Sequence, residues 1–183
     1  RREIPFSGHA ALGVAWVVRR RLTPDAADEI DIAMPLGDTH VRFEGDAAAE
    51  TAWLTAPTIE LGSAWPARDV HRVLGLRGVP TSGLTPPQLT GAGLPFLIVP
   101  VPGLAQLQSC VLDSAAFKSF AVQMVRHKAL NAVVYVFCRE TRSADHQIAA
   151  RLFLPGDEEG AEDPASGAAA ACLGAYLTVH GGL

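Results

Sequence analysis

A chain of 183 residues, 49% of them hydrophobic, is long enough for one large domain or two small ones and can bury a core. The formal net charge of −4 gives no general attraction to nucleic acid, since a nucleic-acid-binding face is expected to be basic. The sequence has no apolar run of about 20 residues, so no membrane-spanning segment is expected.

The first predicted element is a helix over residues 7–22, for which Ser7 is a candidate N-cap. Its residues are apolar on nearly every side, which is typical of a helix enclosed within a fold. Three short strands are predicted next, over residues 30–34, 41–43 and 51–55. Turn-like residues separate these strands, so we expect antiparallel pairing.

The second part of the chain begins with a short predicted helix over residues 67–74, which ends at Gly75. Residues 81–93 are rich in Gly, Pro and Thr and are interpreted as a loop. The other elements expected in this part are a strand over residues 94–101, a helix over 112–125, strands over 132–138 and 148–154, and an apolar helix over 166–179. Because helices and strands do not alternate strictly, the order favours an α+β fold.

The three cysteines, Cys110, Cys138 and Cys172, are odd in number and far apart, which does not suggest a disulfide framework. The chain has no CxxC pair, and its histidines lack metal-ligand spacing, so no metal site is predicted. Three reduced, buried thiols fit a reducing compartment, and we therefore expect a cytoplasmic protein.

Two segments of the chain resemble each other, residues 3–11 and residues 162–170. They share the pattern E-x-P-x-S-G-x-A-A, with agreement at six of nine positions, and each opens one of the two apolar helices. Chance similarity in an Ala-rich and Gly-rich chain is the alternative explanation. The identical Glu, Pro, Ser and Gly are harder to attribute to chance than the alanines.

A helix start of this kind can bind an anion. The first turn of a helix has backbone N–H groups without helical partners and carries partial positive charge. A glycine there lets a ligand approach the backbone closely. Two such helix starts facing each other could hold a small carboxylate and stabilise the carbanion formed when a proton leaves the neighbouring carbon.

These segments resemble the motifs of the phenazine-biosynthesis PhzF-like family. Residues 3–13, EIPFSGHAALG, look like the family motif around its Gly-His pair. Residues 151–155, RLFLP, and 162–168, EDPASGA, are similar to its R-x-F-x-P and E-D-P-A-T-G-S segments. Residues 91–96, GAGLPF, match the start of a second-domain strand. The motifs occur in family order over nearly the whole chain, which makes them specific together.

The resemblance implies the α+β fold of the diaminopimelate epimerase-like superfamily. That fold has two similar domains, each a curved and mostly antiparallel sheet around a central helix, with the active site between them. The central helices would be those over residues 7–22 and 166–179. We expect residues 1–56 to form part of the N-terminal domain and residues 57–183 the C-terminal domain.

The activity implied by the resemblance is that of a cofactor-independent isomerase or epimerase. It would move a proton on the carbon next to the carboxylate of a small amino-acid-like or cyclic acid, in a biosynthetic pathway. Asp163 and His9 correspond to candidate catalytic groups. The candidate substrate-binding residues are Gly8, His9, Ser166, Gly167 and Ala168. Ala168 stands where the family usually has Ser, whereas Ser166 replaces a Thr and keeps its hydroxyl.

The sequence departs from the family pattern at both ends. The family's main general acid/base is a Glu in the first strands, well before the Gly-His motif, and residues 1–7 contain no counterpart. Family members also continue beyond the last helix. We therefore expect a member that is short at both ends and catalytically incomplete alone. A homodimer, or a second chain supplying the N-terminal segment, is the expected macromolecular partner.

Two other functions remain open. The first is a non-catalytic protein that binds small molecules or acts as a scaffold, which the missing Glu and Ala168 favour. The second is a hydrolase that uses Ser166, His9 and Asp163, although the chain has no G-x-S-x-G nucleophile elbow.

Overall fold

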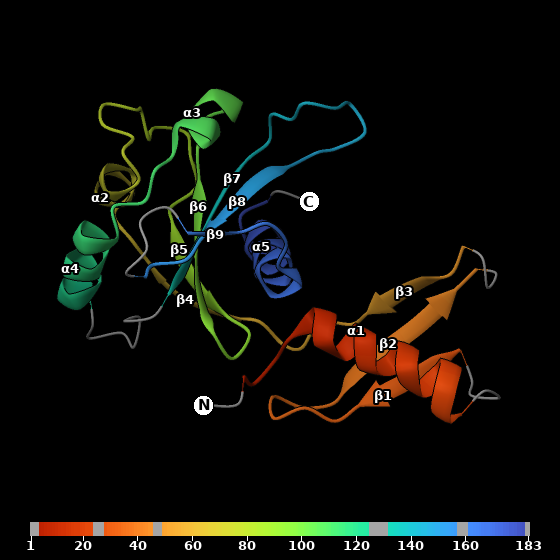
Figure 1. Cartoon of the computed structure of the whole chain (residues 1–183). Helices are drawn as coiled ribbons and strands as arrows, with labels where there is room; N and C mark the ends of the chain where they lie inside the picture. The colour runs from red at the N-terminus through yellow and green to blue at the C-terminus, as the bar shows by residue number, and fades with distance from the viewer. Residues whose placement is uncertain (1–3, 24–27, 46–48, 125–131, 157–160, 182–183) are drawn as a thin grey trace.

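The structure of the protein is a computed structural model, which describes residues 4–23, 28–45, 49–124, 132–156 and 161–181. Its strands form two separate sheets, one of three strands and one of six. Figure 1 shows the small sheet and its helix as one lobe and the large sheet, with helices on both faces, as another. This mixture confirms the predicted α+β class.

The N-terminal lobe contains α1 and three strands, as predicted. Helix α1 (Gly8–Val17) continues directly into a π-helical segment, η1 (Val18–Leu22). The strands are β1 (Glu29–Ile32), β2 (Thr39–Glu44) and β3 (Thr51–Leu54), in the order β1-β2-β3. Both pairs are antiparallel, which confirms the expected pairing.

Helix α1 is covered on one side only. Ala15 packs with Val41 and Phe43 of β2 on the side that faces the small sheet. Val14 and Trp16, by contrast, are 49% and 48% exposed. The prediction that this helix is enclosed on every side is therefore wrong for the described residues, because the small sheet covers a single face of an apolar cylinder.

The arginines at the end of this helix bind to the neighbouring loops. Arg19 forms ion pairs with Asp28 at 3.0 Å and with Glu50 at 3.2 Å, and Arg20 reaches Glu50 at 3.1 Å. The guanidinium of Arg19 also lies over the ring of Phe43, 4.7 Å from its centroid. The cluster thus ties η1 to the sheet beneath it.

The larger lobe is built on a six-stranded sheet with the order β4-β5-β6-β7-β8-β9. All neighbouring strands are antiparallel except β6 and β7, whose parallel pairing requires a crossover through α3 and α4. The strands are β4 (Glu60–Ala64), β5 (Gln88–Gly91), β6 (Pro95–Pro100), β7 (Val133–Cys138), β8 (Ala149–Phe153) and β9 (Glu162–Asp163). The helices are α2 (Ala67–Val73), α3 (Leu104–Ser109), α4 (Ser114–Met124) and α5 (Gly167–Val179).

Each face of the large sheet carries its own hydrophobic core. Along β6, Leu97 and Val99 point into the core under α2 and α4, while Phe96 and Ile98 point into the core under α5. Strand β6 is therefore buried on both faces. Figure 1 shows α5 on one side of the sheet and α2 and α4 on the other.

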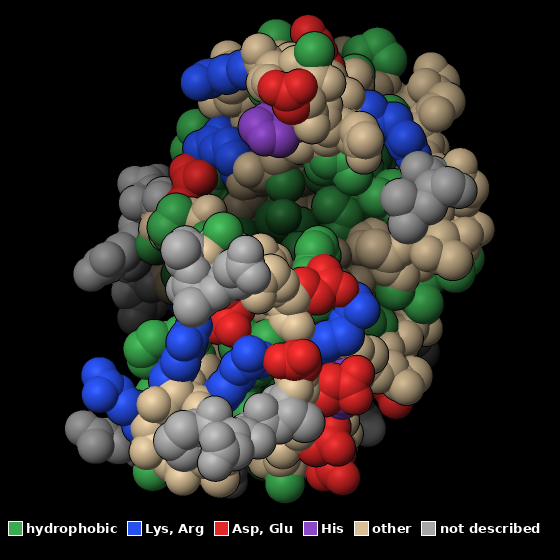
Figure 2. All heavy atoms as spheres, turned by 90° about the vertical axis from the view of Figure 1, so that its right-hand side faces the viewer, with side chains coloured by type: hydrophobic (Ala, Val, Ile, Leu, Met, Phe, Trp, Pro, Cys, Tyr) green, Lys and Arg blue, Asp and Glu red, His purple; other side chains and the backbone are tan. Residues whose placement is uncertain are grey.

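The predicted division between residues 56 and 57 falls in the segment that joins β3 to β4, and hence between the two sheets. That the two parts are independent domains stays a prediction. Seen from the side in Figure 2, the upper lobe is hollowed, and hydrophobic side chains line the hollow.

Within the described ranges, no helix is long and apolar enough to cross a membrane. In the same ranges, no group of three or more His, Cys, Asp or Glu side chains is arranged to hold a metal ion.

The three cysteines are expected to be almost unreactive in the folded protein. All three are buried as free thiols, and burial raises the pKa of Cys110 to about 11. Because the thiolate is the reactive form, alkylation by iodoacetamide at pH 8 should be at least about 100-fold slower than in the urea-unfolded protein. Mass spectrometry of timed samples measures both rates. Similar rates for the folded and unfolded protein would contradict this burial.

Candidate active site

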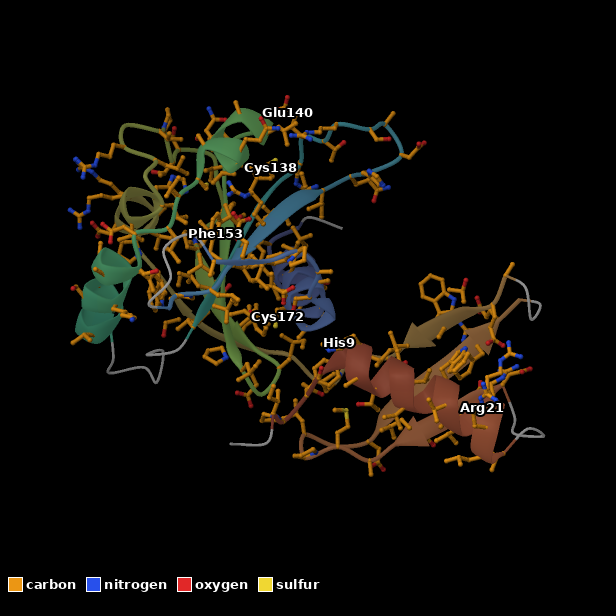
Figure 3. All side chains as sticks on the ribbon, in the orientation of Figure 1. His9, Arg21, Cys138, Glu140, Phe153 and Cys172 are labelled. Atoms are coloured by element: carbon orange, nitrogen blue, oxygen red, sulfur yellow. The ribbon has the colours of Figure 1, made fainter. Side chains whose placement is uncertain are left out.

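The first turns of α1 and α5 lie next to each other. A Cβ atom added to Gly8 would be 4.0 Å from the Cα atom of Gly167. The two helices also contact each other. Figures 1 and 3 show α1 approaching the lower end of α5, with His9 on the approaching side. The two segments that resemble each other in sequence therefore meet in space.

The segment before α1 holds this arrangement in place. Phe6 is 3% exposed and packs in the same core as Ala169 and Cys172 of α5. Beside it, Pro5 rests on the turn between β5 and β6, where a Cβ atom on Gly93 would come within 2.6 Å of the Pro5 Cβ. Because Phe6 and Pro5 are anchored to the large lobe, the start of α1 is held beside α5.

Replacement of Gly93 by alanine should therefore weaken the packing of Pro5 against the turn between β5 and β6. Gly93 has φ +79°, and its Cβ would clash with Pro5. Gly83→Ala is the matched control, because Gly83 has φ +81° and nothing within 4 Å. The control should lose about 1 kcal/mol of unfolding free energy from backbone strain, and Gly93→Ala at least about 1 kcal/mol more. Urea unfolding measures both values, and equal losses would argue against the contact with Pro5.

The two helix starts offer backbone N–H groups but differ in their caps. The first helical hydrogen bonds run from the Ala11 N–H to the Ser7 carbonyl and from the Ala170 N–H to the Ser166 carbonyl, both 3.0 Å long. The amides before them have no helical acceptor. The Ser166 hydroxyl accepts from the Ala169 N–H at 3.3 Å. Ser7 occupies the N-cap position of α1, but its side chain makes no cap hydrogen bond, unlike our expectation.

The candidate site residues near these amides differ in exposure and in hydrogen bonding. His9 lies in the first turn of α1 and is exposed. Ala168 is half-buried and packs against the core beneath α5. Asp163, in β9, accepts a hydrogen bond from the Ala165 N–H through Oδ1 at 3.0 Å. This bond shapes the turn that leads into α5 and leaves Oδ2 for other partners.

Glu162 is part of an ion pair. Its two carboxylate oxygens accept hydrogen bonds from Arg151, from Nε at 3.0 Å and from Nη2 at 2.5 Å. These bonds raise the pKa of the Arg151 guanidinium above its already high ordinary value. Glu162 therefore serves as the anchor of β9 to β8. Glu3, its counterpart in the sequence repeat, lies outside the described residues.

Arg151 is a positioning residue to which sequence reasoning assigned no role. Its Nη1 donates to three carbonyl oxygens at the end of α3, those of Leu107 at 2.8 Å, Gln108 at 3.1 Å and Cys110 at 2.9 Å. Its guanidinium lies over the Phe153 ring, 4.7 Å from the centroid. An arginine inside an apolar strand is a signal that such partners exist, although the sequence does not name them.

The geometry does not favour a hydrolase. Among the described residues, no hydrogen bond joins Ser166 to His9 or to Asp163. The Ser166 hydroxyl oxygen instead caps α5. A nucleophilic serine is expected within hydrogen-bonding reach of its base.

Comparison with known proteins agrees with this architecture. A family model described as phenazine biosynthesis-like protein matches residues 1–183. The chain belongs to the phenazine biosynthesis-like (PhzF) family. An uncharacterised isomerase of Mesorhizobium japonicum is 28% identical over 178 residues, which cover 93% of this chain and 57% of that protein.

Two solved structures confirm the fold of this PhzF-family chain. A predicted epimerase from Pseudomonas aeruginosa has a TM-score of 0.72 and 24% identity, covering 100% of this chain and 60% of its own. A PhzF-family phenazine biosynthesis protein from Bacillus anthracis has a TM-score of 0.70 and 20% identity, covering 96% and 58%. The chain thus spans about three-fifths of the length of these relatives.

The structure brings the starts of α1 and α5 together, as the hypothesis of a shared site requires. Whether these residues contact a substrate stays a prediction. It concerns Gly8, His9, Asp163, Ser166, Gly167 and Ala168.

Proposed function

We propose that this PhzF-family protein is an isomerase or epimerase that moves a proton on the carbon next to a carboxylate. The substrate is a small amino-acid-like or cyclic acid, and no cofactor takes part. The proposal is supported by the family, by the name isomerase given to the Mesorhizobium relative and by the name predicted epimerase given to the Pseudomonas structure.

The observation that carries the proposal is the approach of Gly8 to Gly167, with 4.0 Å between an added Cβ and the facing Cα. Two helix starts at this spacing concentrate backbone N–H donors and the positive ends of two helix dipoles. A small carboxylate is the ligand whose charge and size fit such a pair of donors. Neither glycine has a side chain to keep the ligand away from the backbone.

The reaction needs only protons to move. A base removes the proton from the carbon beside the carboxylate, and the electron pair of the broken C–H bond spreads into the carboxylate as an enolate-like anion. N–H groups aimed at the carboxylate oxygens stabilise this added charge more than they stabilise the substrate. A proton then returns to the opposite face of the same carbon, or to another carbon of a conjugated substrate.

His9 and Asp163 are the proposed proton-transfer groups. His9 is exposed on the first turn of α1, and its imidazole has one ring nitrogen that can accept a proton and one that can donate. Asp163 is half-buried beside the start of α5 and keeps one carboxylate oxygen outside the turn that it caps. His9 belongs to α1 and Asp163 to β9, the strand that leads into α5, so the two groups can act on opposite sides of a bound acid.

A non-catalytic binding protein is the second candidate. It is favoured by the engagement of both carboxylates near α5, since Glu162 is held by Arg151 and Asp163 Oδ1 is held by the Ala165 N–H. Such a protein would bind the same acids between α1 and α5 without exchanging their protons.

Hydrogen exchange in deuterated water separates the two candidates. The protein with its native termini, established by intact mass, is incubated with a panel of cyclic and aryl amino acids, including proline and phenylglycine. Loss of the α-proton signal in NMR spectra is the expected result for an isomerase. The variant His9→Gln/Asp163→Asn should bind the same acid but exchange at least about 100-fold more slowly.

The possible outcomes either distinguish the two candidate functions or exclude both. Binding without exchange by the unaltered protein would establish the binding function and refute the isomerase. The absence of both binding and exchange across the panel would contradict both proposals. The intact mass also reveals a homodimer or a second chain when it is recorded under native conditions.

A further inference from the structure

A second cavity lies on the opposite side of the large sheet from α5. It is formed by α2 and the loop that follows it and has a volume of about 670 Å³, within the range of small-molecule sites. Figure 1 shows α2 on the far side of the sheet from α1 and α5. The cavity is therefore separate from the proposed isomerase site.

Positive charge gathers around this cavity in a chain that is negative overall. Arg68, Arg72 and Arg77 line it, together with one carboxylate, Asp69. Asp69 pairs with Arg72 at 3.3 Å, with both side chains largely exposed. Among the described residues, Arg68 and Arg77 have no acidic partner. Two guanidinium groups are thus left to meet an anion at the rim.

A buried histidine at the inner wall adds a second, independent feature. His71 lines the cavity and is 1% exposed. Its Nε2 donates to the carbonyl oxygen of Pro100 at 3.0 Å, while its Nδ1 is buried without a hydrogen-bond partner. Burial lowers the pKa of His71, which keeps the ring neutral. With the proton on Nε2, the unpartnered Nδ1 is an acceptor.

These two features select one kind of ligand. The planar guanidinium fork binds oxyanions in bidentate fashion, and phosphate is one of its preferred partners. A buried acceptor without a partner gains a hydrogen bond from a hydroxyl or N–H donor that reaches it. Near pH 6 a carboxylate is deprotonated and offers no such donor, whereas a phosphate monoester, with a second pKa of about 6, is about half monoanionic and then carries negative oxygens and a hydroxyl.

The apolar part of the cavity wall would contact the organic part of the phosphate ester. Leu76, Val79 and Pro80 line the cavity beside the arginines. Their apolar surfaces suit a short carbon chain or ring attached to the phosphate.

We infer that the cavity between α2 and residues 76–81 binds a small phosphate monoester, with Arg68 and Arg77 on the phosphate oxygens and His71 Nδ1 accepting from its hydroxyl. The inference is independent of the isomerase proposal.

Titration with glycerol 3-phosphate at pH 6 tests this inference. The binding heat gives the affinity, and the ¹⁵N signal of His71 Nδ1 should shift in a saturable way. Sulfate, which has no hydroxyl at this pH, should bind at least about fivefold more weakly despite its greater charge. The double variant Arg68→Gln/Arg77→Gln should lose at least about tenfold in affinity.

Two further variants control for charge and for folding. Arg142→Gln removes one positive charge from the wall of a different cavity, which Arg142 lines together with His146, and should change the affinity by less than about twofold. His71→Leu removes the Nδ1 acceptor, together with the donor to the Pro100 carbonyl, and should lessen the preference over sulfate.

The inference is overturned if glycerol 3-phosphate shows no saturable binding up to about 10 mM, a weak affinity for any specific site. It is also overturned if the double arginine variant binds as well as the unaltered protein, or if sulfate binds as tightly as the ester. The arginine side chains are exposed, so the arginine variants remain informative even where His71→Leu fails to fold.

Discussion

Replacement of Gly167 by valine is expected to abolish binding of small carboxylic acids while the protein stays folded. A Cβ atom on Gly167 would meet nothing within 4 Å, so the new side chain fits without displacing protein atoms. It would instead occupy the space in front of the first-turn amides and keep a carboxylate from the N–H groups. Gly8→Val should act in the same way, because its branched side chain extends toward the Gly167 backbone 4.0 Å away.

Matched controls come from glycines farther along the same helices. Gly13 in α1 and Gly174 in α5 also have nothing within 4 Å of an added Cβ. The variants Gly13→Val and Gly174→Val should bind proline or phenylglycine as the unaltered protein does. We expect the loss at Gly8 or Gly167 to exceed about 100-fold in affinity, with less than about 1.5 kcal/mol change in unfolding free energy. NMR titration and urea unfolding measure the two quantities, and unchanged affinity would exclude a site at the helix starts.

Replacement of Arg151 by methionine should produce the largest loss of stability among single polar substitutions in the large lobe. The change removes two hydrogen bonds to Glu162 and three to carbonyl oxygens at the end of α3. The Arg151 and Glu162 side chains are 27% and 36% exposed, so water compensates in part. We expect a loss of about 2–4 kcal/mol in unfolding free energy, measured by urea denaturation.

Two control variants test whether the loss of stability comes from the hydrogen-bond geometry of Arg151 or from its charge alone. Arg151→Lys keeps the charge but not the planar fork, and should recover less than half of the loss. Arg42→Gln breaks an exposed pair with Glu44 at 2.8 Å and should cost less than about 0.5 kcal/mol. Full rescue by lysine would mean that the multiple hydrogen bonds of Arg151 contribute little.

The sequence predicted the elements with strong local patterns. Alternating residues indicated the first two strands of the small sheet, and two apolar segments indicated α1 and α5. It missed β5, because Gln88–Gly91 lies in a stretch rich in Gly, Pro and Thr. That stretch becomes a strand only because β4 and β6 pair with it on either side. Strand β4 and the short helix α3 were also missed, since neither has a periodic pattern long enough to detect.

The meeting of the two helix starts was suggested by the sequence repeat, since each copy opens an apolar helix and a shared anion site needs two such starts facing each other. The role of Arg151 could not be predicted in this way. Its partners lie 41 to 44 residues before it and 11 residues after it, and only the folded sheet brings them together. The burial of α1 was overestimated. An apolar helix surface shows which residues could be buried, but the neighbouring strands determine which residues are buried, and here they cover only one side.

The anchoring of Phe6 has a consequence for motion between the lobes. Only Ser7 separates this buried ring from the first residue of α1, so the linker has almost no slack. Any rotation of the small lobe is therefore limited by two connections, this one and the segment that joins β3 to β4, and it would move the amides of α1 relative to those of α5. A ligand bound to both helix starts would restrict this rotation and slow backbone amide exchange in the segment around Phe6.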